Sequence, residues 1–143
     1  MSIINRFQST PVRAGASTVL YGYVIVREKW RGTELAQLLQ EKVNLVFEDG
    51  LGLVDFHLSQ RACILYISET DLVSGNEFKR RLVRFRKVSN LQLRGIVLAE
   101  RTRLSDQYYS PVQNFVVLEL GMTLLPVTNR SEAAQLIFHL NAE

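Results

Sequence analysis

Apolar residues in the first half of the chain follow two alternating patterns, one typical of strands and one typical of a helix. The run 19–26, VLYGYVIV, is rich in β-branched and aromatic residues and therefore predicts a buried strand. In 33–43 the leucines recur on one helical face. Three further apolar runs predict strands: 44–48, 53–59 and 61–68. The first of them ends at Asp49-Gly50, a strong turn signal.

Capping residues indicate where helices of the second half begin. Ser74 and Glu77 match the capping box S-x-x-E, in which each side chain satisfies an unpaired backbone N–H. The helix that they open carries the basic run KRRLVRFRK. The stretch 105–120 is mostly helical, but Pro111 interrupts it, and we expect Ser110 to cap a restarted helix.

Strands separate these helices and set the fold class. The runs 93–100 and 122–127 predict strands, and Pro126 places the second at an edge or at its end. Asn129 is expected to cap the last helix. The alternating order predicts parallel strands here, with antiparallel hairpins in the first half. We therefore predict an α/β fold: a single three-layer domain with a mixed, mostly parallel central sheet flanked by helices.

The composition agrees with one globular domain, which we place at 18–143 after a flexible segment 1–17. Of the 143 residues, 47% are hydrophobic and 22% are charged. The net charge of +3 permits a nucleic-acid partner without requiring one. The single cysteine, Cys63, fits a reducing compartment and a buried structural thiol. No apolar run reaches the roughly 18 residues of a membrane span.

Residues that could carry chemistry form no recognisable motif. His57, His139 and Cys63 lack metal-ligand spacing, and no phosphate-cradling glycine loop is present. Five carboxylates cluster in the first half: Glu48, Asp49, Asp55, Glu69 and Asp71. We interpret Asp49 as a turn residue and expect the other four to face solvent. No metal ion or cofactor is expected.

The basic run forms a candidate nucleic-acid surface on its helix. At about 100° per residue, Phe78, Leu82 and Phe85 share one narrow face that docks on the sheet. Most of the remaining circumference is cationic, and no acid lies between Phe78 and Ala99 to offset it. The candidate DNA-binding residues are Lys79, Arg80, Arg84, Arg86, Lys87 and Arg94. The alternative is an ordinary solvated face with snorkelling arginines.

Seven stretches in order resemble a known family over about 19–140. They are EKWRG, FEDGL, CILYISE, DLVSGN, KRRLVRFR, LRGIVL and LELGMTLLPV. Together they closely resemble the non-catalytic, Fanconi anaemia-associated members of the XPF-type endonuclease family. The resemblance implies a nuclease-like fold and a non-catalytic DNA-repair subunit in the nucleus. It also implies that the protein helps to target the Fanconi anaemia core complex to single-stranded or branched DNA at stalled forks and interstrand crosslinks.

The resemblance further implies a protein partner, the nuclease-like domain of the FANCM translocase. XPF-like domains pair through their C-terminal helices, and an apolar surface lies near that end of this chain. Its residues are Tyr108, Tyr109, Val112, Phe115, Val116 and Leu120. Some of them must pack on the sheet, so a core-only role remains an alternative. The family continues into a tandem helix-hairpin-helix domain, which we expect to be absent here because the match ends with the last predicted helix.

The family's catalytic pattern is missing at several positions. Active members carry an aspartate after the first strand, where this chain has Arg27. The Gly-Asp pair of the third strand corresponds to Val54-Asp55, so one metal-type carboxylate remains. In the V-E-R-K-S motif, Leu65 replaces the glutamate and Ile67 the lysine. A single aspartate cannot hold a catalytic metal pair. A pure dimerisation module and a residual metal-dependent endonuclease are the alternatives.

Overall fold

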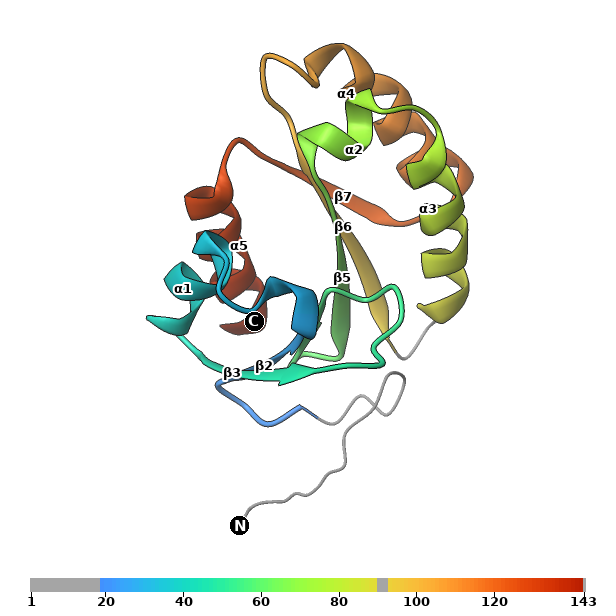
Figure 1. Ribbon diagram of the computed structural model, residues 1–143. Coiled ribbons are helices and arrows are strands. Elements are labelled where there is room, and N and C mark those ends of the chain that lie inside the picture. The colour runs from blue at the N-terminus through green and yellow to red at the C-terminus, as the bar shows by residue number, and fades with distance from the viewer. Residues whose placement is uncertain (1–18, 90–92, 143) are drawn as a thin grey trace.

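The computed structural model describes residues 19–89 and 93–142, so the predicted flexible segment 1–17 lies outside the described residues. Six strands form one sheet in the order β3-β2-β4-β5-β6-β7 (Figure 1). The strands are β2 (Tyr23–Arg27), β3 (Asn44–Glu48), β4 (Phe56–Leu58), β5 (Ala62–Ile67), β6 (Arg94–Glu100) and β7 (Thr123–Val127). The helices are α1 (Glu34–Gln40), α2 (Glu69–Val73), α3 (Glu77–Val88), α4 (Asp106–Gln113) and α5 (Arg130–Ala142). Two further turns of helix are η2 (Glu28–Trp30), a 3-10 turn, and η3 (Asn114–Glu119), a π-helix.

The sheet is mixed and mostly parallel, as predicted. β5, β6 and β7 are parallel to one another, and β4 runs antiparallel to both β2 and β5. In the first half, β4 and β5 form an antiparallel hairpin as expected, but β2 pairs with β3 in parallel. The connection through α1 accounts for this, since a helical crossover returns the chain to the same end of the sheet. Pro126 lies in β7, an edge strand, as its missing N–H requires.

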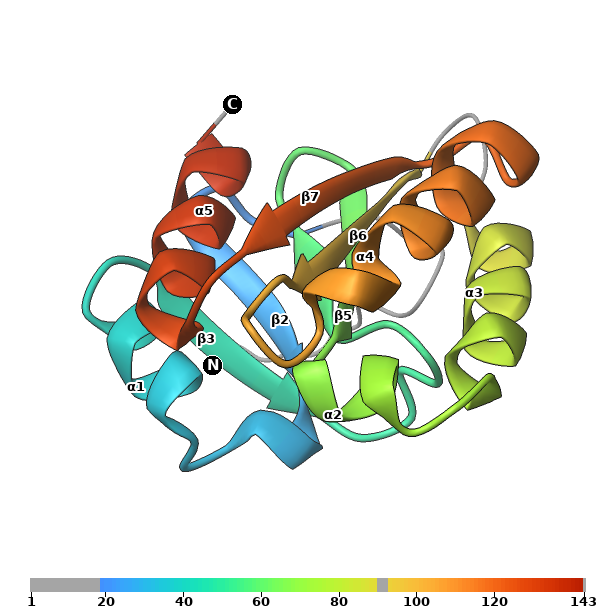
Figure 2. The ribbon, with the colours of Figure 1, turned by 90° about the horizontal axis from the view of Figure 1, so that it is seen from above.

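Helices cover both faces of the sheet and create two apolar cores. α1 and α5 pack on one face, and α2, α3 and α4 pack on the other (Figures 1 and 2). On the second face, the predicted anchors Phe78, Leu82 and Phe85 are buried against β5 and β6. The three-layer prediction is therefore confirmed.

The predicted capping box of α3 is wrong. Ser74 ends α2 instead, where its N–H donates to the Thr70 carbonyl, and α3 begins after Asn76 without a side-chain cap. The capping box of this region lies six residues earlier, at Ser68 and Asp71. Asp71 N–H donates to Ser68 Oγ at 3.1 Å, and Ser68 N–H donates to the Asp71 carboxylate at 2.9 Å. It opens the short helix α2, which the hydrophobic pattern did not predict.

The predicted restart of the helix at Ser110 is also wrong. α4 passes through Pro111, and the chain then continues directly into the π-helix η3. Proline removes only its own N–H, while the neighbouring backbone bonds and the buried side chains of Tyr109 and Val112 hold the helix together. Gly121, with φ of +68°, ends the segment as expected.

Candidate functional site

Asp55, the one aspartate expected from the nuclease pattern, is fully buried just before β4. Its side chain is 0% exposed. Trp30 Nε1 donates to Oδ1 at 3.0 Å, and the Tyr66 N–H donates to Oδ2 at 2.7 Å. The expectation that Asp55 faces solvent is therefore wrong. A buried carboxylate needs donors on its oxygens, and residues from η2 and β5 supply them.

Two cations complete the surroundings of Asp55. Arg27 Nη1 lies 3.6 Å from Oδ1, and Lys29 Nζ lies 3.7 Å from the same atom. Both come from the end of β2 and the turn after it, and both are partly exposed. A divalent cation needs several oxygen ligands, whereas this carboxylate has two N–H donors and two positive charges around it. The arrangement stabilises a buried charge and repels a metal ion.

A second buried carboxylate, Glu100, lies at the end of β6. Tyr66 Oη donates to its Oε2 at 2.6 Å, Glu69 N–H to its Oε1 at 2.7 Å, and Arg130 Nε to its Oε2 at 2.9 Å. Burial, together with the hydrogen bond to Glu100, raises the pKa of the Tyr66 hydroxyl well above its usual range. Tyr66 therefore bonds both carboxylates, Asp55 through its backbone and Glu100 through its side chain. The only sequence signal for Glu100 was an acid at the end of an apolar strand.

The two positions that the sequence pattern aligned with the catalytic glutamate and lysine, Leu65 and Ile67, are part of the core. Leu65 and Ile67 are 0% exposed and pack in the cluster under α2, α3 and α4. In the part of the chain that the structure describes, no three Asp, Glu, His or Cys side chains gather where they could hold a metal ion. This edge of the sheet is filled with apolar side chains and internally satisfied carboxylates.

Asp71 also has a structural role. It closes the capping box of α2 and forms an ion pair with Arg81 at 3.2 Å. Burial raises its pKa, but the hydrogen bonds from Ser68 and the charge of Arg81 outweigh burial and hold the pKa below its usual value. The Arg81 guanidinium also donates to the Tyr66 carbonyl at 3.3 Å, which ties α3 to β5. Asp71 is half-buried, so it is not a free surface carboxylate.

The buried histidine and cysteine are neighbours on β4 and β5. His57 pairs with Cys63 in the antiparallel register. Burial lowers the pKa of His57 to about 4, and its Nε2 has no hydrogen-bond partner. Burial raises the pKa of the Cys63 thiol to about 12, and the side chain is buried, as expected of a structural thiol. His139 is exposed and its Nδ1 is bonded to the Gln135 carbonyl.

The candidate cationic surface divides between the two sides of the sheet. The five candidates on α3 are all exposed: Lys79, Arg80, Arg84, Arg86 and Lys87. Arg94 lies elsewhere, although it too is exposed. It pairs in register with Ala62, whose side chain belongs to the core under α1 and α5, so the Arg94 side chain leaves the sheet on the face opposite α3. The sequence pattern grouped Arg94 with the cations of α3 because it follows them closely along the chain.

The cations of α3 differ in their protein contacts. Arg80 lies 3.9 Å from Glu77 in an exposed ion pair, which is worth little in water. Arg86 Nε donates to the Leu120 carbonyl at 2.8 Å. For Arg84 and Lys87, the described residues provide no ion-pair partner. These last two side chains have their full charge available to a ligand.

The candidate partner surface is partly core and partly exposed. Tyr109, Val112 and Val116 are buried against the sheet. Tyr108 is exposed, whereas Phe115 and Leu120 are half-buried. Two residues that the sequence pattern missed extend the exposed part: Val117 and Leu118, the latter 77% exposed. They were missed because an α-helical wheel does not describe the π-helix η3 on which they lie.

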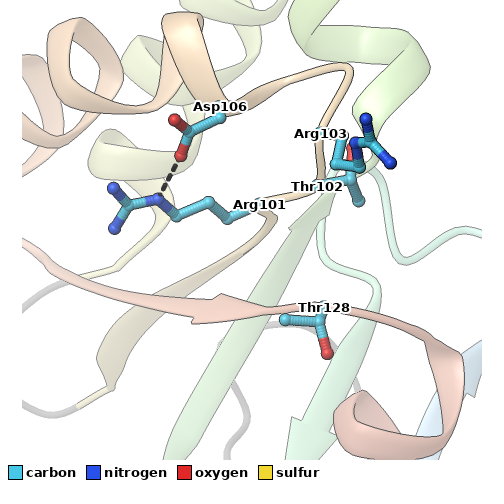
Figure 3. Close-up of a pocket in the computed structure, with 5 residues that line it drawn as sticks. All are labelled: Arg101, Thr102, Arg103, Asp106 and Thr128. Atoms are coloured by element: carbon cyan, nitrogen blue, oxygen red, sulfur yellow. Dashed lines mark hydrogen bonds and ion pairs between the residues drawn. The ribbon is translucent and has the colours of Figure 1, made fainter.

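A hollow lies where β6 and β7 end, lined by Arg101, Thr102, Arg103, Asp106 and Thr128 (Figure 3). Arg101 Nε bonds Asp106 at 2.7 Å, and the Thr128 hydroxyl bonds Glu132 at 3.0 Å. The Arg103 side chain points away from that ion pair (Figure 3). Because most polar groups here already have partners, the hollow offers little to a ligand.

Comparison with known proteins gives consistent matches. Residues 16–141 match the family described as "FANCM pseudonuclease domain". Relatives named "Fanconi anemia core complex-associated protein 24" are 50% identical over 136 residues in Mus musculus, 52% over 133 in Bos taurus and 49% over 136 in Homo sapiens. The matches cover 95%, 93% and 95% of this chain, but 61%, 61% and 62% of the relatives. The chain thus spans about three fifths of the length of these relatives.

Solved structures show the same fold. "XPF from Aeropyrum pernix" superposes with a TM-score of 0.68, covering 83% of this chain and 63% of that one. "XPF from Aeropyrum pernix, complex with DNA" gives 0.69, covering 84% and 63%. Both are 14% identical in sequence, so the likeness concerns the fold alone. It confirms the predicted XPF-type nuclease-like architecture. Among the described residues, no helix has the length and apolar character to cross a membrane.

Proposed function

The chain belongs to the FANCM pseudonuclease domain family, and we propose that it is a non-catalytic DNA-repair subunit that forms a heterodimer with the nuclease-like domain of FANCM. The resemblance drawn from the seven sequence stretches is thereby confirmed. In this proposal the chain helps to target the Fanconi anaemia core complex to single-stranded or branched DNA at stalled forks and interstrand crosslinks. Its location would be the nucleus.

The surroundings of Asp55 carry the non-catalytic part of the proposal. Arg27 stands where active relatives of the fold carry an aspartate, and its guanidinium lies 3.6 Å from the remaining carboxylate. Leu65 and Ile67 replace the glutamate and the lysine, and both are fully buried. Neither side chain can ligate a hard cation or move a proton.

The heterodimer is supported by the family and by the apolar surface near the C-terminal end. The relatives are named for association with the Fanconi anaemia core complex. Tyr108, Val117 and Leu118 are exposed large apolar side chains on α4 and η3. Large apolar side chains that stay exposed on one helical segment are candidates for a protein interface. We assign this exposed part, together with Phe115 and Leu120, to the partner.

DNA contact is assigned to α3. Its exposed cations lie on the solvent side of a helix whose apolar side is anchored in the core. Lys and Arg side chains that neutralise phosphates supply most of the sequence-independent affinity for DNA. Arg94, on the opposite face, would contact DNA only as a separate point.

We further propose that 18–143 is one nuclease-like domain and that a helix-hairpin-helix domain, where present, adds affinity for DNA.

The proposal is tested by mixing the purified chain with the FANCM pseudonuclease domain and measuring mass by sedimentation. We expect a one-to-one complex that Leu118→Asp disrupts while the exposed control Glu41→Ala does not. A stable monomer at micromolar concentration in the presence of this partner would contradict the heterodimer. A complex that forms but shows no salt-dependent DNA binding would instead support a pure dimerisation module.

A further inference from the structure

Two cations of α3 contact the two ends of the π-helix η3. The Lys79 ammonium lies over the Phe115 ring, 5.6 Å from its centroid. The Arg86 Nε donates to the Leu120 carbonyl at 2.8 Å. Lys79 and Arg86 are two helical turns apart and therefore lie on the same side of α3. Figures 1 and 2 show α3 beside the segment formed by α4 and η3, on the same face of the sheet.

The carbonyl that Arg86 binds belongs to the end of a helix, where carbonyls lose their intrahelical donors. The Leu120 N–H donates to the Phe115 carbonyl at 3.0 Å and closes the last π turn. Gly121 then turns the chain out of the helix, with φ of +68°. A guanidinium at this point satisfies the carbonyl and interacts favourably with the negative end of the helix. Arg86 thus fixes the end of the turn that carries Val117 and Leu118.

The other exposed cations of α3 form a second stripe. Arg80, Arg84 and Lys87 recur at i, i+4 and i+7, so they lie in line along the helix. At 3.6 residues per turn, this stripe is rotated by roughly 100° from the side that contacts η3. Within the described parts of the chain, Arg80 forms an ion pair only with the exposed Glu77. The contacts within the protein therefore separate two groups of cations that the sequence presents as one run.

We propose that α3 performs two separate tasks with these two stripes. Arg80, Arg84 and Lys87 bind the phosphates of DNA, which narrows the DNA contact of α3 to these three of its five exposed candidates. Lys79 and Arg86 are positioning residues: they hold η3 so that Val117 and Leu118 keep the arrangement that the partner domain binds. This inference rests on the proposed function, because it takes the apolar surface of η3 to be the partner surface.

The test compares two glutamine variants of neighbouring arginines. Arg86→Gln removes the contact to Leu120, and Arg84→Gln is the matched control on the other stripe. Arg86→Gln is expected to weaken binding to the FANCM pseudonuclease domain by roughly tenfold, which is near the lower limit for the loss of one hydrogen bond from a charged donor. Its melting temperature and its affinity for single-stranded DNA should stay near those of the unsubstituted chain. Arg84→Gln should do the reverse, with weaker DNA binding and unchanged partner binding.

A double variant distinguishes positioning from a general structural effect. With Leu118→Ala already present, Arg86→Gln should cost less partner affinity than it does alone, because the positioned side chain is gone. Additive losses in this cycle would overturn the inference. So would equal losses of DNA affinity in the two glutamine variants with partner affinity unchanged. If Arg86→Gln lowers the melting temperature strongly, Arg86→Lys, which keeps a donor and the charge, must restore partner affinity. Leu118→Ala without any effect on partner binding would refute the proposed partner surface itself.

Discussion

Arg27 forms an ion pair with the buried carboxylate of Asp55. The guanidinium at the end of β2 lies 3.6 Å from a carboxylate that is fully buried and already accepts two N–H donors. In a metal-dependent nuclease the space beside such a carboxylate belongs to a divalent cation. Here the guanidinium of Arg27 lies beside the carboxylate, so we expect Asp55 to contribute to folding and not to catalysis.

The purified chain should not cut DNA. With Mg²⁺ or Mn²⁺ added, we expect no cleavage of flaps, forks or single strands. Both carboxylate oxygens of Asp55 already accept hydrogen bonds, and the side chains of Leu65 and Ile67 contain no oxygen that could bind a metal ion. Gel analysis of labelled substrates checks this. Cleavage that copurifies with the chain and disappears in Asp55→Asn would refute the claim.

Asp55 should be needed for stability. Asp55→Ala leaves the Trp30 and Tyr66 N–H groups buried without an acceptor, and we expect a loss of about 3 kcal/mol in the free energy of unfolding. Asp55→Asn keeps one acceptor oxygen, so its free energy of unfolding should fall by less. Urea denaturation followed by the fluorescence of Trp30, the one tryptophan of the sequence, measures both. The exposed Glu41→Ala serves as control, and a loss for Asp55→Ala as small as for this control would contradict the assigned role.

His57 should make the fold sensitive to mild acid. Its pKa is lowered to about 4 in the folded protein, from 6.5 in an unfolded chain, so the unfolded state binds the proton more readily. The stabilisation is complete above the unfolded pKa and is lost as pH falls through 6.5 towards 4. Between pH 7.5 and pH 5, the free energy of unfolding should fall by about 2 kcal/mol because of this group.

The contribution of His57 is isolated by difference. His57→Gln should show a flatter dependence of unfolding free energy on pH over this range than the unsubstituted chain. Parallel curves for the unsubstituted chain and His57→Gln would show that the buried imidazole does not titrate in this way.

Cys63 should resist thiol reagents. Burial removes access and raises its pKa to about 12, so almost no thiolate exists near neutral pH. Ellman's reagent is expected to react only after denaturant is added. Ser110→Cys, which adds a thiol at an exposed position of α4, is the positive control. Rapid labelling of Cys63 in the native chain would contradict its buried position.

Local patterns predicted most elements, because strand and helix periods are properties of neighbouring residues. The anchoring side of α3, the cap at Asn129 and the edge strand with Pro126 all follow from such short-range signals. The capping box was misplaced because two serine-acid pairs compete within ten residues. Only tertiary structure decides that Ser68, at the end of β5, is the one used.

The site residues depended on contacts that a single sequence does not display. The donors that bury Asp55 come from Trp30 and Tyr66, on other elements. Arg94 follows the basic run by a few residues, yet strand alternation turns it to the opposite face of the sheet. A cation's distance along the chain therefore does not say which surface it joins.

The salt dependence of DNA binding tests the central claim most directly. The heterodimer with the FANCM domain should bind single-stranded DNA with an affinity that falls as salt rises. Replacing Arg80, Arg84 and Lys87 with glutamine should reduce the slope of log K against log salt by about 2, since each phosphate contact contributes roughly 0.7. The same exchange at the exposed Arg31, Lys42 and Arg61, outside α3, should leave the slope nearly unchanged. Equal slopes for the α3 variant and the unsubstituted heterodimer would contradict the account and leave α3 as a solvated face.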